Sequence, residues 1–124
     1  MESLSPNLFV KDINTSIAFY KSLGFKVSMT VPEKGDYVWA MLNCGKVTIM
    51  LQTIKSLGKE MPAIHRKTGG SLLLYIRINK IRAFFKKIKS KAEILTELEK
   101  TFYGATEFSL KDPDGYVLTF AEDE

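Results

Sequence analysis

The stretch YGATEFSLKDPDGY, residues 103–116, contains a strand, a tight turn and the start of a second strand. Within it Phe108 and Leu110 alternate with polar residues, which is the pattern of a β-strand that buries one face. The Asp-Pro-Asp-Gly sequence at 112–115 is typical of a turn, because proline and glycine supply the backbone angles that a tight turn needs. The stretch therefore predicts a β-hairpin near the C-terminus.

Outward from this hairpin, the second half of the chain predicts one helix and two more strands. The helix, Lys80–Ser90, carries apolar residues at helical spacing, and lysines fill its other side. Together these elements have the order β-α-β-β-β. The strands are expected at Leu72–Ile78, Glu93–Leu98, Thr106–Lys111 and Tyr116–Ala121.

The first half of the chain repeats this order. Asp12 is a good N-cap for a helix that ends before Gly24, and turn residues such as Cys44-Gly45 separate the strands around it. The tetrapeptide 18–21 in this helix also matches 83–86 in the second. A repeat of element order over half the chain indicates two related modules. The strands here are expected at Leu8–Val10, Phe25–Val31, Asp36–Asn43 and Val47–Thr53.

The predicted fold is α+β, a single domain made of two βαβββ modules. The modules span about 3–53 and 71–122, and a connection, 54–70, joins them. Connections of this length are often functional or mobile. A helical turn around Ile64 is possible within it. His65, the only histidine, is interpreted as a solvated or structural residue, with contact to a ligand as the alternative.

Composition excludes several classes of protein. The chain has 124 residues, of which 45% are hydrophobic and 26% charged, which is the balance of an ordinary globular domain. No signal peptide and no apolar run long enough for a membrane span are visible, and the single Cys44 suits reducing surroundings, so we expect a cytoplasmic protein. The net charge of +4 comes largely from lysines on the solvent-exposed face of the second predicted helix. The aromatic residues of that helix lie at the spacing expected for its buried face. Binding of nucleic acid is therefore not expected.

Two segments resemble the vicinal oxygen chelate superfamily, which includes glyoxalases, bleomycin resistance proteins and extradiol dioxygenases. They are residues 10–25, with Leu23-Gly24-Phe25 at their end, and residues 103–116. The second is closest to the bleomycin-resistance branch. The resemblance implies that the curled mixed sheets of the two modules form an open cup with the helices outside. It also implies a homodimer and a ligand site inside the cup, where catalytic members hold a divalent metal with four His and Glu side chains.

The four positions that correspond to those metal ligands carry other residue types here. By the spacing of the family they are Ser5, Met50, Leu73 and Thr119. None supplies the imidazole or carboxylate that such metals prefer. We therefore expect no metal and no cofactor, and we expect no catalysis that depends on one.

Without a metal, the inside of the cup is expected to be aromatic and apolar. Strand alternation groups Tyr37, Trp39 and Met41 on one face, opposite the set 38, 40 and 42 that we assign to the face under the helix. A two-residue loop at Cys44-Gly45 would pair Trp39 with Met50. The alternative is that Trp39 and Met50 belong to a closed core or to a dimer interface.

The predicted ligand-binding residues are spread over both modules. Glu107 would be the one anionic group of the cup, and Tyr103 would lie at its rim. The alternatives are a surface position on its strand for Glu107 and a loop aromatic that covers the core for Tyr103. The full set is Ser5, Trp39, Met41, Met50, Tyr103, Glu107 and Thr119.

The sequence is compatible with three functions. The first is a metal-free protein that binds a hydrophobic or aromatic small molecule, as in antibiotic sequestration. The second is a lyase, isomerase or dioxygenase with an unrecognised metal site or an acid–base pair such as Glu107 with Tyr103. The third is an interaction module whose apolar face binds a partner. Because the chain is basic, a neutral or anionic ligand fits the first function better than a cationic one.

Overall fold

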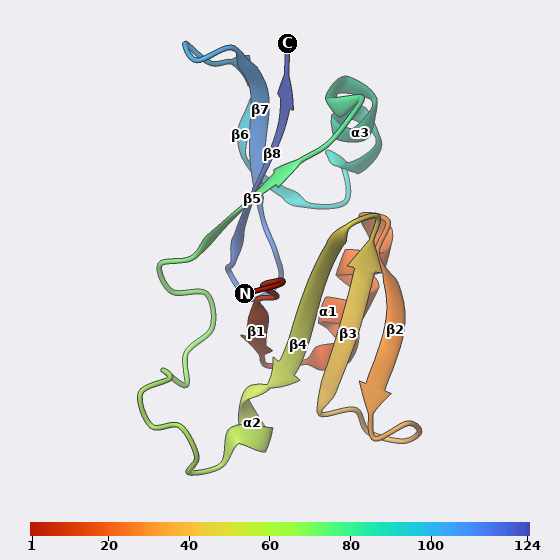
Figure 1. The fold of residues 1–124 in the computed structure, drawn as a ribbon, viewed down its shortest axis with the longest axis vertical. Helices are drawn as coiled ribbons and strands as arrows, with labels where there is room; N and C mark the ends of the chain where they lie inside the picture. The colour runs from red at the N-terminus through yellow and green to blue at the C-terminus, as the bar shows by residue number, and fades with distance from the viewer. The chain divides into compact units, whose positions relative to one another are not determined.

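The computed structural model describes all 124 residues and divides them into two compact units, Met1–Thr68 and Gly69–Glu124. Each unit contains one four-stranded mixed sheet and one main helix, and the order β-α-β-β-β occurs twice, as predicted (Figure 1). The first unit contains β1 (Asn7–Val10), α1 (Ile13–Ser22), β2 (Lys26–Val31), β3 (Trp39–Cys44), β4 (Val47–Thr53) and α2 (Ile54–Leu57). The second contains β5 (Leu73–Arg77), α3 (Ile81–Ile88), β6 (Glu93–Lys100), β7 (Ala105–Lys111) and β8 (Val117–Asp123).

Sheet A, the sheet of the first unit, has the strand order β1-β4-β3-β2, with β1 parallel to β4 and the other pairs antiparallel. One face packs against α1, where Tyr20 is completely buried. The helix begins where predicted, because the Asp12 carboxylate accepts hydrogen bonds of 3.1 Å from the backbone N–H groups of Asn14 and Thr15. The buried strand residues on this face are Leu8, Val10, Ala40, Leu42, Ile49 and Leu51.

Sheet B, the sheet of the second unit, has the equivalent order β5-β8-β7-β6. Phe84 and Phe85 on α3 pack against Phe108 on β7, with ring centroids 6.1 and 4.9 Å away. Phe120 on β8 stacks on Phe108 at 5.3 Å. Four aromatic rings therefore form the centre of this core.

The start of α3 differs from a conventional N-terminus. The sequence predicted a helix from Lys80, but Lys80 has a left-handed backbone (φ 58°) and the helix begins at Ile81. Its free N–H groups are satisfied from β8, since the Glu122 carboxylate accepts from the backbone N–H of Lys80 at 2.8 Å and of Ile81 at 3.1 Å. A carboxylate at this position also interacts favourably with the helix dipole.

The predicted register of the β3–β4 hairpin was wrong by two residues. The loop consists of Gly45 and Lys46, so Met50 lies opposite Met41 and Gln52 lies opposite Trp39. Gly45 has φ 57°, which a type II′ turn requires at its first central position and which glycine adopts at little cost. Because the error is an even number of residues, each side chain stays on its predicted face.

The predicted strand Asp36–Asn43 begins later than expected, at Trp39. Residues 32–38 form the connection after β2, and the backbone of Val38 closes it by bonding to Val31 and Thr53. Val38 was predicted to pack under the helix with Ala40 and Leu42. Its side chain is instead 38% exposed, whereas Ala40 and Leu42 are buried.

Arg66 organises the connection between the units. Its guanidinium donates hydrogen bonds to four backbone carbonyls, of Gly58, Glu60, Met61 and Ile64, at distances of 2.5–3.1 Å. Ile64 takes part only in a turn, and the helical turn of this connection is α2 at Ile54–Leu57. The neighbouring residue, His65, is exposed, as a solvated histidine would be.

Two phenylalanines of the second unit test how stability is distributed. Phe108→Ala should lower the free energy of unfolding by about 3–5 kcal/mol, because it opens a cavity among the buried rings. Phe102→Ala, at a fully exposed side chain, should change it by less than about 0.5 kcal/mol. Chemical denaturation followed by circular dichroism measures both. Equal losses from the two variants would contradict the packing described.

Candidate functional site

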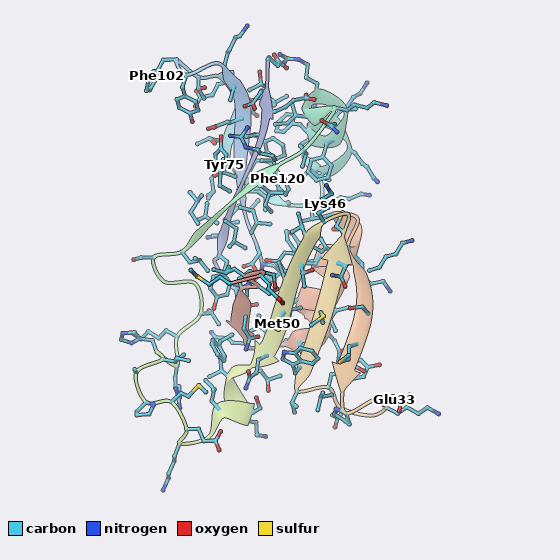
Figure 2. All side chains as sticks on the ribbon, viewed as in Figure 1. Glu33, Lys46, Met50, Tyr75, Phe102 and Phe120 are labelled. Carbon is cyan, nitrogen blue, oxygen red and sulfur yellow. The ribbon has the colours of Figure 1, made fainter.

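The face of sheet A opposite α1 carries a row of three methionines. Met50 on β4 lies opposite Met41 on β3, and Met41 lies opposite Met29 on β2. The next row contains Trp39, opposite Val31 on one side and Gln52 on the other. We call Met29, Trp39, Met41 and Met50 the methionine face, and Met50 is labelled in Figure 2. Three of its four residues were predicted, and strand alternation combined with the β2–β3 pairing adds Met29.

Polar side chains on the same face hydrogen-bond to one another. Asn7 donates its amide N–H to Gln52 Oε1 at 2.9 Å, and Gln52 donates in turn to Ser56 Oγ at 3.1 Å. Asn43 donates to Thr48 Oγ1 at 2.6 Å. These bonds satisfy most of the polar side-chain groups named, apart from Asn7 Oδ1, which is buried without a hydrogen-bond partner.

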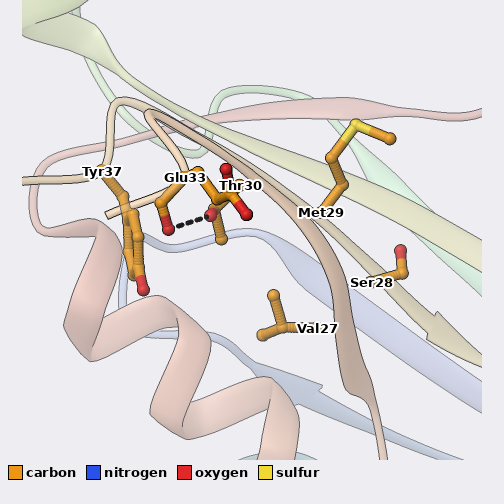
Figure 3. Close-up of a pocket in the computed structure, with 6 residues that line it drawn as sticks. All are labelled: Val27, Ser28, Met29, Thr30, Glu33 and Tyr37. Atoms are coloured by element: carbon orange, nitrogen blue, oxygen red, sulfur yellow. Dashed lines mark hydrogen bonds between the residues drawn. The ribbon is translucent and has the colours of Figure 1, made fainter. Parts of the chain in front are cut away.

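A pocket of about 510 Å³ lies along β2 next to the methionine face (Figure 3). Val27 and Tyr37 line it from the α1 side of the strand, whereas Met29 points to the other side. Thr30 Oγ1 donates to the backbone carbonyl of Glu33 at 3.4 Å across its end. Met29 thus belongs both to the methionine face and to the pocket wall.

Tyr37 also lines a second pocket, of about 380 Å³. Tyr37 was predicted to accompany Trp39 and Met41, but it precedes β3 and lines both pockets instead. The other residues around this second pocket are Lys11, Asp36, Val38, Thr53, Lys55 and Ser56.

The second unit holds a separate group of side chains, on the face of sheet B opposite α3. Tyr75 on β5 and Tyr103 in the β6–β7 turn both donate a hydrogen bond to Glu107 Oε2, at 2.5 and 2.6 Å. We call Tyr75, Tyr103 and Glu107 the tyrosine cluster. The sequence predicted Tyr103 and Glu107 as site residues. It missed Tyr75, although alternation from Leu73 places residue 75 on the same face.

The carboxylate raises the pKa of both phenols. The hydrogen bond to Glu107 is the main cause, since ionising a phenol would lose that bond and place two negative charges side by side. The pKa of Tyr75 rises to about 12, and that of Tyr103 is also raised. Both side chains therefore remain neutral hydrogen-bond donors well above neutral pH.

Of the remaining predicted residues, Thr119 lies directly opposite Tyr75 of the tyrosine cluster in the register of β5 and β8, whereas Ser5 and Leu73 belong to neither group. Thr119 is buried on β8 and shares a hydrogen bond of 2.8 Å with Ser109. Ser5 lies just before β1 and is half-buried, whereas Leu73, at the start of β5, is 53% exposed. No group of three or more His, Cys, Asp or Glu side chains in the structure could hold a metal ion. The hydroxyl, thioether and alkyl groups at Ser5, Met50, Leu73 and Thr119 do not fit a metal that prefers imidazole or carboxylate.

Comparison with known proteins gives the family and the fold. The family model described as "Glyoxalase/Bleomycin resistance protein/Dioxygenase superfamily" matches residues 4–120. A protein of unknown function from Agrobacterium tumefaciens is 25% identical with a TM-score of 0.80, the match covering 100% of this chain and 95% of that one. TioX from Micromonospora sp. ML1 is 16% identical with a TM-score of 0.79, and a bleomycin-binding protein crystallised with bleomycin is 23% identical with a TM-score of 0.69, each match covering both chains fully. A search of curated protein sequences found no match.

These likenesses agree with the α+β fold predicted from the sequence. No helix of the structure has the length and apolar character needed to cross a membrane.

Replacement of Glu107 by Gln tests the tyrosine cluster. The pKa of Tyr75 should fall from about 12 towards its ordinary value near 10, because the charge that opposes ionisation is gone. A raised pKa in the folded state stabilises the fold fully below about pH 10, and this contribution is lost as the pH rises towards 12. Titration of the tyrosine ring carbons by NMR measures the shift. A titration of Tyr75 that Glu107→Gln leaves unchanged would contradict the cluster.

Proposed function

Because this chain belongs to the glyoxalase/bleomycin resistance protein/dioxygenase superfamily, we propose that it is a metal-free protein that binds a hydrophobic or aromatic small molecule. The ligand lies on the methionine face, within a cleft of a homodimer. In this proposal the protein is cytoplasmic. It sequesters its ligand, as an antibiotic-binding protein would, and does not transform it.

The observation that carries the proposal is the methionine face itself. Trp39, Met41 and Met50 are each half-buried, so their side chains keep area for contact with a ligand. A tryptophan supplies a large rigid surface, and methionine side chains adapt to the shape of what they contact. The pocket along β2 reaches this surface only at Met29, because Val27 and Tyr37 line it from the α1 side of the strand.

The residues at the family's four metal-ligand positions support a function without a metal. The catalytic members use the metal as a Lewis acid that polarises the substrate. Ser5, Met50, Leu73 and Thr119 provide no equivalent set of ligands, so the same fold serves binding by apolar contact.

One neighbour supports the binding of a small molecule, since a bleomycin-binding protein of similar fold was crystallised with bleomycin. The net charge of +4 favours a neutral or anionic aromatic ligand for the methionine face.

A second candidate function rests on the tyrosine cluster. The hydrogen bond of 2.6 Å between Tyr103 and Glu107 has the geometry of an acid–base pair, which is the alternative enzymatic function. The raised pKa of Tyr103 keeps the phenol protonated, so in such a pair Tyr103 would donate a hydrogen bond to the substrate and the Glu107 carboxylate would act as the base. A superfamily enzyme without a metal would use it in this way.

Titration with 8-anilinonaphthalene-1-sulfonate, an anionic aromatic probe, tests binding at the methionine face. Trp39 is the only tryptophan, so its fluorescence reports this face alone, and saturable quenching is expected. Met50→Gln should weaken binding about tenfold, because a polar amide replaces apolar contact area. Met61→Gln is the matched control, at an exposed methionine outside the face, and should change the affinity by less than about twofold. Equal effects from both variants, or no saturable quenching, would reject the site.

Metal content tests the metal-free part of the proposal. Purified protein should contain far less than one equivalent of Ni, Zn, Fe or Mn. Added metal should not raise the melting temperature, since a ligand raises it only by binding the folded state. Stoichiometric metal that EDTA removes together with probe binding would overturn this part and favour the enzymatic alternative.

A further inference from the structure

The tyrosine cluster lies beside an exposed aromatic surface. Phe102, next to Tyr103 in the β6–β7 turn, is completely exposed and projects away from the strands (Figure 2). Its ring meets that of Tyr103 edge to face, with centroids 5.1 Å apart. Tyr103 and Tyr75 are 57% and 47% exposed. Three aromatic rings thus accompany Glu107, all within the second unit.

The Glu107 carboxylate has an unused acceptor. Both phenols donate to Oε2, and Oε1 receives no hydrogen bond. Glu107 also lacks a paired cation, because the nearby basic residues of the sheet bind other acids: Arg77 pairs with Asp123, and Lys111 pairs with Glu93 at 2.9 Å. A charged oxygen therefore remains available next to the rings.

A second carboxylate adds to the negative charge of this surface. Glu99 on β6 lies directly opposite Glu107 in the register of the sheet. Like charges at opposed positions of neighbouring strands repel each other. A positive group placed between the two side chains would relieve that repulsion.

We propose that the tyrosine cluster with Phe102 binds an organic cation, namely an ammonium or amidinium group attached to an aromatic or alkyl body. The cation donates an N–H to Glu107 Oε1 in a charge-assisted hydrogen bond. The negative faces of the aromatic rings attract the same charge, and their apolar area contacts the body of the ligand. This site goes beyond the proposed function, because it belongs to a different unit from the methionine face and takes ligands of the opposite charge.

Other classes of ligand fit this surface less well. Glu99 and Glu107 would repel an anion. A metal ion would need at least three suitable ligands, and the structure contains no such group. A neutral apolar molecule would cover Oε1 without giving it a hydrogen bond, which carries a desolvation cost.

The test is an NMR titration of the whole protein with the probe 2-phenylethylammonium. Shifts are expected at residues 75, 102–103 and 107, and the neutral 2-phenylethanol should bind at least about tenfold more weakly. Glu107→Gln should raise the Kd of the ammonium probe at least about tenfold. Glu97→Gln, the matched control, removes an exposed charge from the same sheet outside the cluster and should change the Kd by less than about twofold.

Tyr75→Phe keeps the ring and should stay within about threefold of the parent protein, because Oε1 is untouched. Equal binding of the neutral and charged probes by the unmodified protein would overturn the proposal, and this comparison needs no variant. Equal effects of Glu107→Gln and Glu97→Gln would also overturn it. Trp39 fluorescence reads the methionine face separately, so failure at one site is distinguishable from failure at the other.

Discussion

The burial of one face of each sheet under a single helix is the constraint on which the rest of the structure depends. Side chains alternate along a strand, so each sheet must divide into a face that packs and a face that does not. In sheet B the packed face is a set of aromatic rings centred on Phe108, and the opposite face carries Tyr75 and Glu107. In sheet A the same division separates Leu42 from Met41. Both candidate sites consist of side chains on the sheet face that does not pack against the helix.

Because this constraint is local and periodic, much of it could be predicted from the sequence. The repeated β-α-β-β-β order, the Asp12 cap and the face that carries Trp39 and Met50 all follow from residue types at fixed spacing. The register did not, because it depends on which two residues form the hairpin loop. The choice between Cys44-Gly45 and Gly45-Lys46 is decided by the backbone angles of Gly45, which spacing alone does not specify.

Sequence patterns could not predict contacts between side chains on strands that are not neighbours in the sheet. Tyr75 and Glu107 are 32 residues apart, and their hydrogen bond requires a long side chain to reach across β8. The net charge of the chain was similarly uninformative about this surface. A protein of charge +4 carries two opposed carboxylates, Glu99 and Glu107, on one face of sheet B. Net charge describes long-range attraction, whereas local pairing decides what a surface binds.

The row formed by Met29, Met41 and Met50 gives sheet A a surface whose polarity is not fixed by the amino-acid sequence. Each thioether can be oxidised to a sulfoxide, which is polar and chiral, and reductases can reverse the change. Met29 is 55% exposed and the other two are half-buried, so oxidants in the solvent reach the row from its β2 end. Oxidation would place a strong hydrogen-bond acceptor where the reduced protein offers only apolar contact. The apolar character of this face therefore depends on the redox state of its surroundings.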